Sequence, residues 1–312
     1  MSNSGEKIDY SLRPAKCIER KMICDVLNLL RGFSDIQKYR YIGFGSFYFV
    51  DFTLFHKELG INDMVSIEGN DNIISRAEFN KPYNFIDLHQ GFSTQVLEIE
   101  IPWTEDKKSI IWMDYDSTIE RYMLDDIEII FERAVPGSIF LMTLNTSIGR
   151  AGNRLEFLKE KLENKCPIGL QENRFITKND AYNFMYDLIN NNIVTQLRTR
   201  NSTINEKVMY QQLFNFRYAD GAPMLTIGGI IYKESEQNLL EKCDLFRYEF
   251  VKTDENHFDI TVPCLTLKEK MEINKNLYSS DNNLSDILKK EDIQQYQRLY
   301  RYFPHYFDAV GI

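Results

Sequence analysis

The chain has 312 residues, of which 43% are hydrophobic and 27% charged, an ordinary composition for a globular protein with one large domain or one domain plus an extension. The net charge of -9 does not support binding of nucleic acid through an overall basic surface, although a local basic patch stays possible. The start of the chain is polar and no apolar run approaches the roughly 18 residues that cross a bilayer, so we expect a cytoplasmic protein without a membrane partner.

The first predicted element is an amphipathic helix over residues 15–30. Its apolar residues recur at helical spacing, Pro14 stands where the helix would begin and Gly32 where it would end. Basic residues gather at its start: Arg13, Lys16, Arg20 and Lys21. Such a cluster could contact phosphate, but it is more often a solvated face paired with acidic neighbours, here Glu19 and Asp25.

Short apolar runs then alternate with helical patterns. Strands are predicted at residues 39–43, 64–68, 84–88, 109–113 and 138–144. Helices are predicted between them at residues 47–59, 71–79 and 118–134. The strands are almost continuously hydrophobic, which is typical of a parallel sheet covered on both faces. This rhythm predicts a doubly wound, Rossmann-like α/β sheet.

The pattern changes after residue 144. Two more helices are predicted, at residues 152–164 and 180–197. Two apolar segments around the turn Ala219–Asp220–Gly221, residues 207–218 and 223–232, predict an antiparallel hairpin that ends the sheet. A further strand pair is predicted at 245–251 and 257–262, followed by helices at 267–276, 284–290 and 292–302. We therefore divide the chain into an N-terminal helical segment (1–38), a core (39–235) and a mixed, largely helical C-terminal extension (236–312).

Candidate ligand-binding residues follow the first three strands. Gly43-Phe44-Gly45-Ser46 opens a helix, where glycine lets the backbone approach a ligand, although such a pair is as often a simple tight turn. Glu68 ends the second strand, where an acid can accept hydrogen bonds from ribose, or can be an exposed carboxylate or helix cap. After the third strand, Phe92 could supply an apolar surface and Ser93 a polar contact to an adenine, or the loop is an ordinary turn.

The most informative cluster, Asp114-Tyr115-Asp116, ends the fourth strand. Ligands bind at the carboxyl edge of open α/β sheets, so Asp114 could bind a cofactor, act as a general base or ligate a cation. Tyr115 could shape the pocket or donate a hydrogen bond, while Asp116 could simply cap the next helix. Asn145, after the fifth strand, could line the pocket or be a second metal ligand beside Asp114. An Asn that begins a loop is the more common role. The isolated histidines and the five scattered cysteines predict no metal site.

Five segments carry a resemblance to a known family. In order and spacing, YIGFGS, VSIEG, IDLHQGFS, IIWMDYD and PGSIFLMTLN resemble successive motifs of the class I S-adenosylmethionine-dependent methyltransferases, over residues 39–232. The segment IIWMDYD looks most like the O-methyltransferase branch. The head of the chain, RPAKCIERKM, resembles that of bacterial proteins in this branch to which no substrate is tied. The resemblance implies a methyltransferase sheet in the core and S-adenosylmethionine as cofactor.

By that resemblance, the cofactor would contact residues after the first three strands. Gly43 and Gly45 would lie beside its methionine portion, and Glu68 would bind its ribose. Phe92 and Ser93 would contact its adenine. Asp114 would sit where the branch often places a base or metal ligand, and Tyr115 would line the acceptor pocket, so these two are the catalytic candidates.

Two departures from the family pattern are visible. Tyr41 stands where an acid usually precedes the first glycine by two positions, and the usual third glycine is missing near Ser46. Either Asp51 or Asp114 then binds the cofactor's amino group instead, or binding of the cofactor is weak or lost. The leading hypothesis is nevertheless an O-directed methyltransferase of unknown acceptor. The alternative is a catalytically silent methyltransferase-like module that binds a nucleotide, nucleic acid or protein partner in a bacterial multi-protein system. A nicotinamide-dependent oxidoreductase comes third, because the terminal hairpin and the absent glycine disfavour it.

Overall fold

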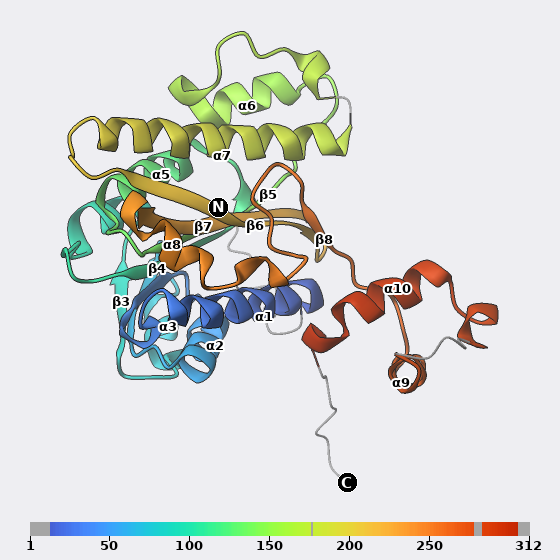
Figure 1. The fold of residues 1–312 in the computed structure, drawn as a ribbon. Helices are drawn as coiled ribbons and strands as arrows, with labels where there is room; N and C mark the ends of the chain where they lie inside the picture. The colour runs from blue at the N-terminus through green and yellow to red at the C-terminus, as the bar shows by residue number, and fades with distance from the viewer. Residues whose placement is uncertain (1–12, 176, 278–282, 305–312) are drawn as a thin grey trace.

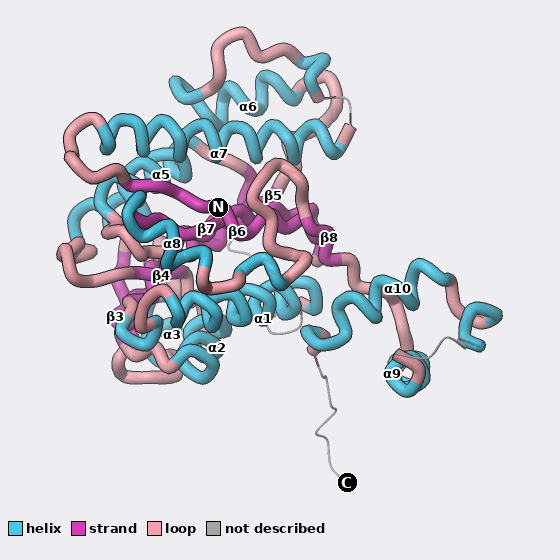
Figure 2. Tube along the Cα trace, in the orientation of Figure 1, coloured by secondary structure: helices cyan, strands magenta, loops and turns pink. Residues whose placement is uncertain are grey.

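A single eight-stranded sheet runs through the molecule, with helices on both faces (Figures 1 and 2). The computed structural model describes residues 13–175, 177–277 and 283–304. The strands are β1 (Arg40–Gly43), β2 (Asp63–Glu68), β3 (Ile86–Gln90), β4 (Ser109–Thr118), β5 (Ile139–Asn145), β6 (Val208–Ala219), β7 (Pro223–Lys233) and β8 (Phe258–Ile260). They lie in the order β3-β2-β1-β4-β5-β7-β6-β8.

The strand directions confirm the predicted sheet with its terminal hairpin. Strands β1 to β5 run parallel to one another, whereas β7 is antiparallel to both β5 and β6. The buried, β-branched runs predicted as strands therefore form the centre of the sheet, as continuous hydrophobicity requires. Strand β4 continues to Thr118, five residues further than predicted, with an irregular register between Asp114 and Thr118.

The C-terminal strand pair was predicted wrongly. The segment 245–251 is not a strand: Leu245–Arg247 forms a 3-10 turn, and the apolar side chains of Leu245, Phe250 and Val251 enter the core singly. A strand buries alternate residues, whereas these side chains are buried at irregular intervals. The high apolar content of the segment was therefore wrongly interpreted as a strand. Strand β8 instead pairs in parallel with β6 and extends the sheet at its far edge.

Ten helices are assigned within the described residues: α1 (Pro14–Leu29), α2 (Val50–Leu59), α3 (Ile74–Asn80), α4 (Ser93–Gln95), α5 (Arg121–Arg133), α6 (Arg154–Leu162), α7 (Lys178–Asn201), α8 (Gln237–Glu241), α9 (Leu267–Lys275) and α10 (Lys290–Leu299). Figure 1 shows α1, α2 and α3 on one side of the sheet and α5 and α7 on the other, with α6 outside α7. The helix predicted at 284–290 is wrong, because that stretch holds a 3-10 turn at Asn283–Asp286 and α10 begins at Lys290. Among the described residues, no helix has the length and apolarity needed to cross a membrane.

Helix α1 lies in the interior, which corrects its predicted solvated basic face. Ten of its sixteen residues are buried, and they include Lys16, Glu19 and Arg20. It packs in one hydrophobic core with α2, the sheet and the C-terminal residues that precede position 305. Its first turn is held by Asp220 in the β6–β7 turn, whose carboxylate accepts the backbone N–H groups of Ala15 (3.2 Å) and Lys16 (2.9 Å). Lys16 and Arg20 therefore belong to the core, whereas Lys21 is only partly buried.

Candidate active site

The carboxyl ends of the parallel strands bring the predicted motifs to one edge of the sheet. Gly43 ends β1 and lies in register with Ser66 of β2 and Trp112 of β4. Glu68 ends β2 two residues further on, and Asp114 follows Trp112 by the same distance. The glycine loop, the candidate ribose ligand and the candidate base therefore stand side by side on three adjacent strands, as predicted for ligand sites of open α/β sheets.

The loop after β1 is shaped by its own aromatic rings. A methyl group on Gly43 would lie 2.5 Å from the Tyr41 hydroxyl oxygen, and one on Gly45 would lie 2.4 Å from the Phe49 ring, so neither position accepts a side chain. The Gly45 N–H donates to Ser66 Oγ at 3.0 Å. Ser46 (φ 50°) and Phe49 (φ 46°) adopt the left-handed backbone that favours glycine, and α2 consequently begins at residue 50 instead of 47.

Tyr41 occupies the position where the family pattern has an acid. Its ring is buried and makes edge contacts with Phe52 and Phe55, at centroid distances of 4.7 and 4.8 Å. Its hydroxyl lies against Gly43 and has no hydrogen-bond partner among the described residues. Burial holds the pKa of this phenol well above its ordinary value. A buried hydroxyl left unpaired costs about 1–3 kcal/mol, so packing alone does not account for a tyrosine rather than a phenylalanine here.

Two of the residues predicted to contact adenosine, Glu68 and Phe92, are accessible at the surface. Glu68 is half-buried, accepts the Asn70 N–H at 2.8 Å through Oε1, and has its pKa raised by burial. The Gly91 N–H donates to the Glu68 carbonyl oxygen at 3.0 Å, which ties the loops after β2 and β3 together. The Phe92 side chain is 67% exposed. A carboxylate and an exposed aromatic ring thus stand on adjacent loops.

The side chains of Ser93 and Tyr115 are turned inward. Both hydroxyls donate to Oδ2 of Asp126, a fully buried residue of α5. Burial raises the pKa of the Asp126 carboxyl and, together with that carboxyl, the pKa of the Tyr115 phenol. The Tyr115 ring packs against Phe44, with centroids 5.3 Å apart. Contact of Ser93 with adenine would therefore involve its backbone, and Tyr115 offers a ligand its ring rather than its hydroxyl.

Asp114 is engaged by a lysine from α1. Lys16 Nζ lies 2.8 Å from Asp114 Oδ1 and 2.8 Å from Glu19 Oε2. It also lies 4.4 Å from the centre of the Trp112 ring and donates to Thr143 Oγ1 at 3.4 Å. We refer to Lys16, Glu19 and Asp114 as the Lys16 cluster. One ammonium therefore faces two carboxylates at the edge of the sheet.

Burial and charge act in opposite directions within the Lys16 cluster. Burial lowers the pKa of Lys16, but the attraction of Asp114 and Glu19 outweighs it and the pKa is raised, so the side chain is an ammonium. Burial raises the pKa of Glu19 against the opposing effect of Lys16. One turn along α1, Arg20 forms a second buried ion pair with Asp51 of α2.

The sequence contained a signal for this buried network. Lys16, Arg20, Ile23 and Leu27 are spaced by four, three and four residues, so the basic residues lie on the same helix stripe as two apolar ones. All four side chains are buried. Extending the apolar stripe towards the start of the helix would have placed these bases in the core. The amphipathic interpretation instead placed them on a solvated face.

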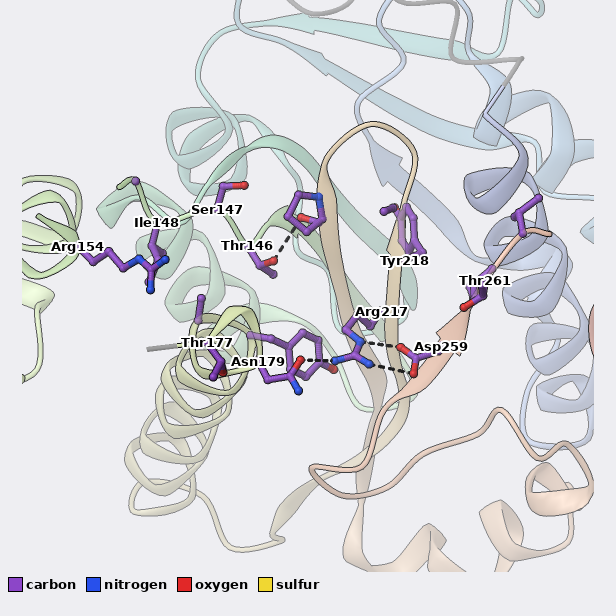
Figure 3. Close-up of a pocket in the computed structure, with 17 residues that line it drawn as sticks. Thr146, Ser147, Ile148, Arg154, Thr177, Asn179, Arg217, Tyr218, Asp259 and Thr261 are labelled. Carbon is purple, nitrogen blue, oxygen red and sulfur yellow. Dashed lines mark hydrogen bonds and ion pairs between the residues drawn. The ribbon is translucent and has the colours of Figure 1, made fainter. Parts of the chain in front are cut away.

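A cavity of about 610 Å³ opens further along the same edge (Figure 3). It lies between the segment after β5, the start of α7, the ends of β6 and β8, and the first residue of β7. Tyr218 of β6 lines it and also has its ring centre 5.8 Å from Lys16 Nζ. The cavity is therefore adjacent to the Lys16 cluster. Within the described residues, no group of three or more His, Cys, Asp or Glu side chains is placed to hold a metal ion.

Comparisons with known proteins agree with this fold. Residues 8–310 match the model of a family described as "Putative O-methyltransferase". No protein of curated function matches the chain significantly.

Three solved structures illustrate the structural similarity. An S-adenosylmethionine-dependent methyltransferase from Mesorhizobium loti is 12% identical, over 40% of this chain and 56% of its own, with a TM-score of 0.30. Trm1 from Pyrococcus horikoshii, in complex with S-adenosyl-L-methionine, is 8% identical over 72% and 58%, with a TM-score of 0.47. The O-methyltransferase TomG from Streptomyces achromogenes is 13% identical over 72% and 91%, with a TM-score of 0.37. The chain thus spans little more than half the length of the first two.

Proposed function

The chain belongs to the O-methyltransferase family whose model it matches over residues 8–310, and on this premise we propose that it is an S-adenosylmethionine-dependent methyltransferase that acts on an oxygen. The observation that carries the proposal is the sheet order β3-β2-β1-β4-β5-β7-β6 with β7 alone reversed among these seven strands. A reversed strand beside β5 is typical of the methyltransferase sheet and disfavours a dinucleotide-binding oxidoreductase.

The adenosine half of the cofactor fits the loops after β2 and β3. The Glu68 carboxylate uses one oxygen on a backbone N–H, which leaves acceptor capacity for ribose hydroxyls. The exposed Phe92 ring provides an apolar face for adenine. Ser93 would contribute through its backbone, because its hydroxyl is committed to Asp126.

The methionine half would lie beside Gly43 and Gly45. The orphaned Tyr41 hydroxyl lies at this point in place of the usual acid, and a polar group brought by the cofactor would give it a partner. Asp114 is our candidate acid for this position, since Asp51 is paired with Arg20, and Lys16 Nζ lies 2.8 Å from Asp114 Oδ1.

S-adenosylmethionine supplies, when bound, an electrophilic methyl group that an acceptor oxygen takes after losing its proton. Methyl transfer requires mainly alignment of the two reacting groups and at most one base, so the site needs no catalytic triad. Asp114 is our candidate to receive the acceptor's proton or to orient its hydroxyl. The ring of Tyr115, buried against Phe44, shapes the floor of this site.

A methyltransferase-like module without catalysis is the second candidate. The Lys16–Asp114 ion pair favours it, because an ammonium at 2.8 Å neutralises the candidate base. The same protein would then bind a nucleotide, nucleic acid or protein partner. Binding of the cofactor without any transfer to an acceptor would distinguish this module from the enzyme.

Calorimetric titration tests the proposal. S-adenosylmethionine and its demethylated product are titrated into the pure full chain, into Glu68→Ala and into Glu105→Ala, an exposed acid in the loop before β4. We expect micromolar binding that Glu68→Ala weakens about tenfold or more, since charge-assisted hydrogen bonds are lost, and that Glu105→Ala leaves unchanged. Absence of binding by folded protein free of co-purified ligand would refute the proposed function.

A further inference from the structure

The cavity beside the Lys16 cluster is large enough for a small organic molecule. Its volume of about 610 Å³ falls within the range of roughly 300–1,000 Å³ that is usual for small-molecule sites. It combines apolar walls with polar groups. The apolar part includes Ile148, Pro223, Ile260 and Val262. The polar part includes Thr177, Asn179, Arg154, Arg217 and Asp259.

The two arginines of the cavity are in different states. Arg217 is saturated: its guanidinium binds both oxygens of Asp259, at 2.6 and 3.0 Å, and donates to Asn179 Oδ1 at 2.8 Å (Figure 3). Its charge is therefore compensated within the wall. Arg154, by contrast, has no carboxylate within ion-pair distance among the described residues, and its Nε is buried without a hydrogen-bond partner.

The surroundings of Arg154 leave its Nε available to a ligand, although part of its charge acts on Glu172, whose pKa is lowered by the backbone N–H of Leu155 and also by the charge of Arg154. Its Nη1 donates to the Phe175 carbonyl oxygen, which fixes the direction of the side chain. The nearby Glu172 carboxylate accepts backbone N–H groups at the start of α6, including that of Arg154 at 3.2 Å, instead of binding the guanidinium. A buried guanidinium nitrogen without a partner is costly, so a ligand anion would stabilise this wall.

The 24-residue helix α7 begins at the cavity and adds neutral polar groups to its wall. Thr177 is the N-cap and Asn179 lies in the first turn. The Asp180 N–H donates to Thr177 Oγ1 at 3.2 Å, and the Thr177 N–H donates to Asp180 Oδ2 at 2.6 Å. Because the Asp180 carboxylate already opposes the positive end of the helix dipole, Arg154 is the group of this wall that favours a ligand anion.

We propose that this cavity binds the methyl acceptor and that the acceptor is a small organic acid that also carries a hydroxyl group. Its carboxylate faces Arg154, and its body lies against the apolar wall. Its hydroxyl extends past Tyr218 towards Asp114, because Tyr218 lines the cavity and contacts Lys16. The hydroxyl is assigned because the proposed function is methyl transfer to oxygen. The carboxylate is assigned from the cavity and Arg154 alone, whatever the reaction.

Binding of matched pairs of compounds tests the assignment without the cofactor. Ligand-observed NMR is recorded on the full chain with hydroxybenzoates and short hydroxy acids, each beside its neutral primary amide. The protein variants are Arg154→Gln, Arg154→Lys and Arg150→Gln, the last being an exposed arginine of the same loop. Ser147→Trp, at an exposed position of the lining, blocks the cavity.

We expect acids to bind about tenfold or more tightly than their amides, which corresponds to one charge-assisted contact. Arg154→Gln should abolish this preference, Arg154→Lys should retain part of it, Arg150→Gln should keep it, and Ser147→Trp should prevent binding. Equal affinity for acids and amides, no binder in the set, or an unchanged preference in Arg154→Gln would overturn the assignment. The outcome is independent of S-adenosylmethionine titration, so failure of this proposal and failure of the proposed function are distinguishable.

Discussion

Replacing Lys16 by methionine should destabilise the protein strongly and in a pH-dependent way. The side chains of Lys16 and Glu19 are 3% and 0% exposed and that of Asp114 is 18% exposed, so the substitution leaves two carboxylates without their cation in a largely dry site. Removing one partner of a buried ion pair costs about 3–5 kcal/mol. We expect Lys16→Met to lose that much free energy of unfolding at pH 7.5.

The pH dependence follows from the raised pKa of Glu19. A carboxyl whose pKa is raised by folding binds a proton more tightly in the folded state than in the unfolded state. Its contribution to the free energy of unfolding therefore declines as the pH rises above about 4.5, the pKa of the unfolded glutamate. Loss of Lys16 raises this pKa further. The pKa of Lys16 itself is raised from 10.5, so its stabilising effect is fully present in wild-type protein below that pH. The difference in free energy of unfolding between wild type and Lys16→Met should therefore be smaller at pH 5 than at pH 8.

Urea unfolding followed by circular dichroism from pH 5 to pH 8 measures both effects. The double variant Lys16→Met/Glu19→Gln should recover part of the loss, because only Asp114 then lacks its partner. Lys38→Met serves as a control, since the Lys38 side chain is 83% exposed and its ion pair contributes little. A loss below about 1 kcal/mol that is independent of pH would refute the buried-cluster reasoning.

Three further outcomes are expected from the same unfolding assay. Arg20→Met and Asp51→Leu should each cost about 3–5 kcal/mol of unfolding free energy. The double variant Arg20→Met/Asp51→Leu should cost clearly less than the sum of the two, because it leaves no unpaired charge; additive losses would contradict the pairing. Ser46→Gly should raise the free energy of unfolding by up to about 1 kcal/mol, since glycine adopts φ 50° without steric cost. A loss of stability would argue against the left-handed backbone of this loop. Gly229→Ala should cost about 3 kcal/mol or more or prevent folding, because its methyl group would lie 2.1 Å from the Gln211 carbonyl oxygen; native stability would disprove that close approach.

Local patterns were sufficient to predict the sheet and the edge at which the candidate site residues meet. Continuous β-branched and aromatic runs such as SIIWM fold as central strands because both faces of the sheet are covered. Gly43 and Glu68 end their strands and Asp114 lies four residues before the end of β4, and these residues had to meet at one edge because parallel strands share their direction. The reversed hairpin followed from a turn between two apolar segments.

Only the tertiary structure decided what these residues contact. The hydroxyls of Ser93 and Tyr115 point to Asp126 on α5, a partner that no local pattern could select. Lys16 reaches Asp114 across 98 positions of sequence, because α1 is buried from several sides. The cavity is assembled from the ends of elements that are distant along the chain. Periodicity predicts which residues of an element turn inward. Long-range packing determines which charges, hydroxyls and cavities they meet there, because those contacts depend on how whole elements are placed against one another.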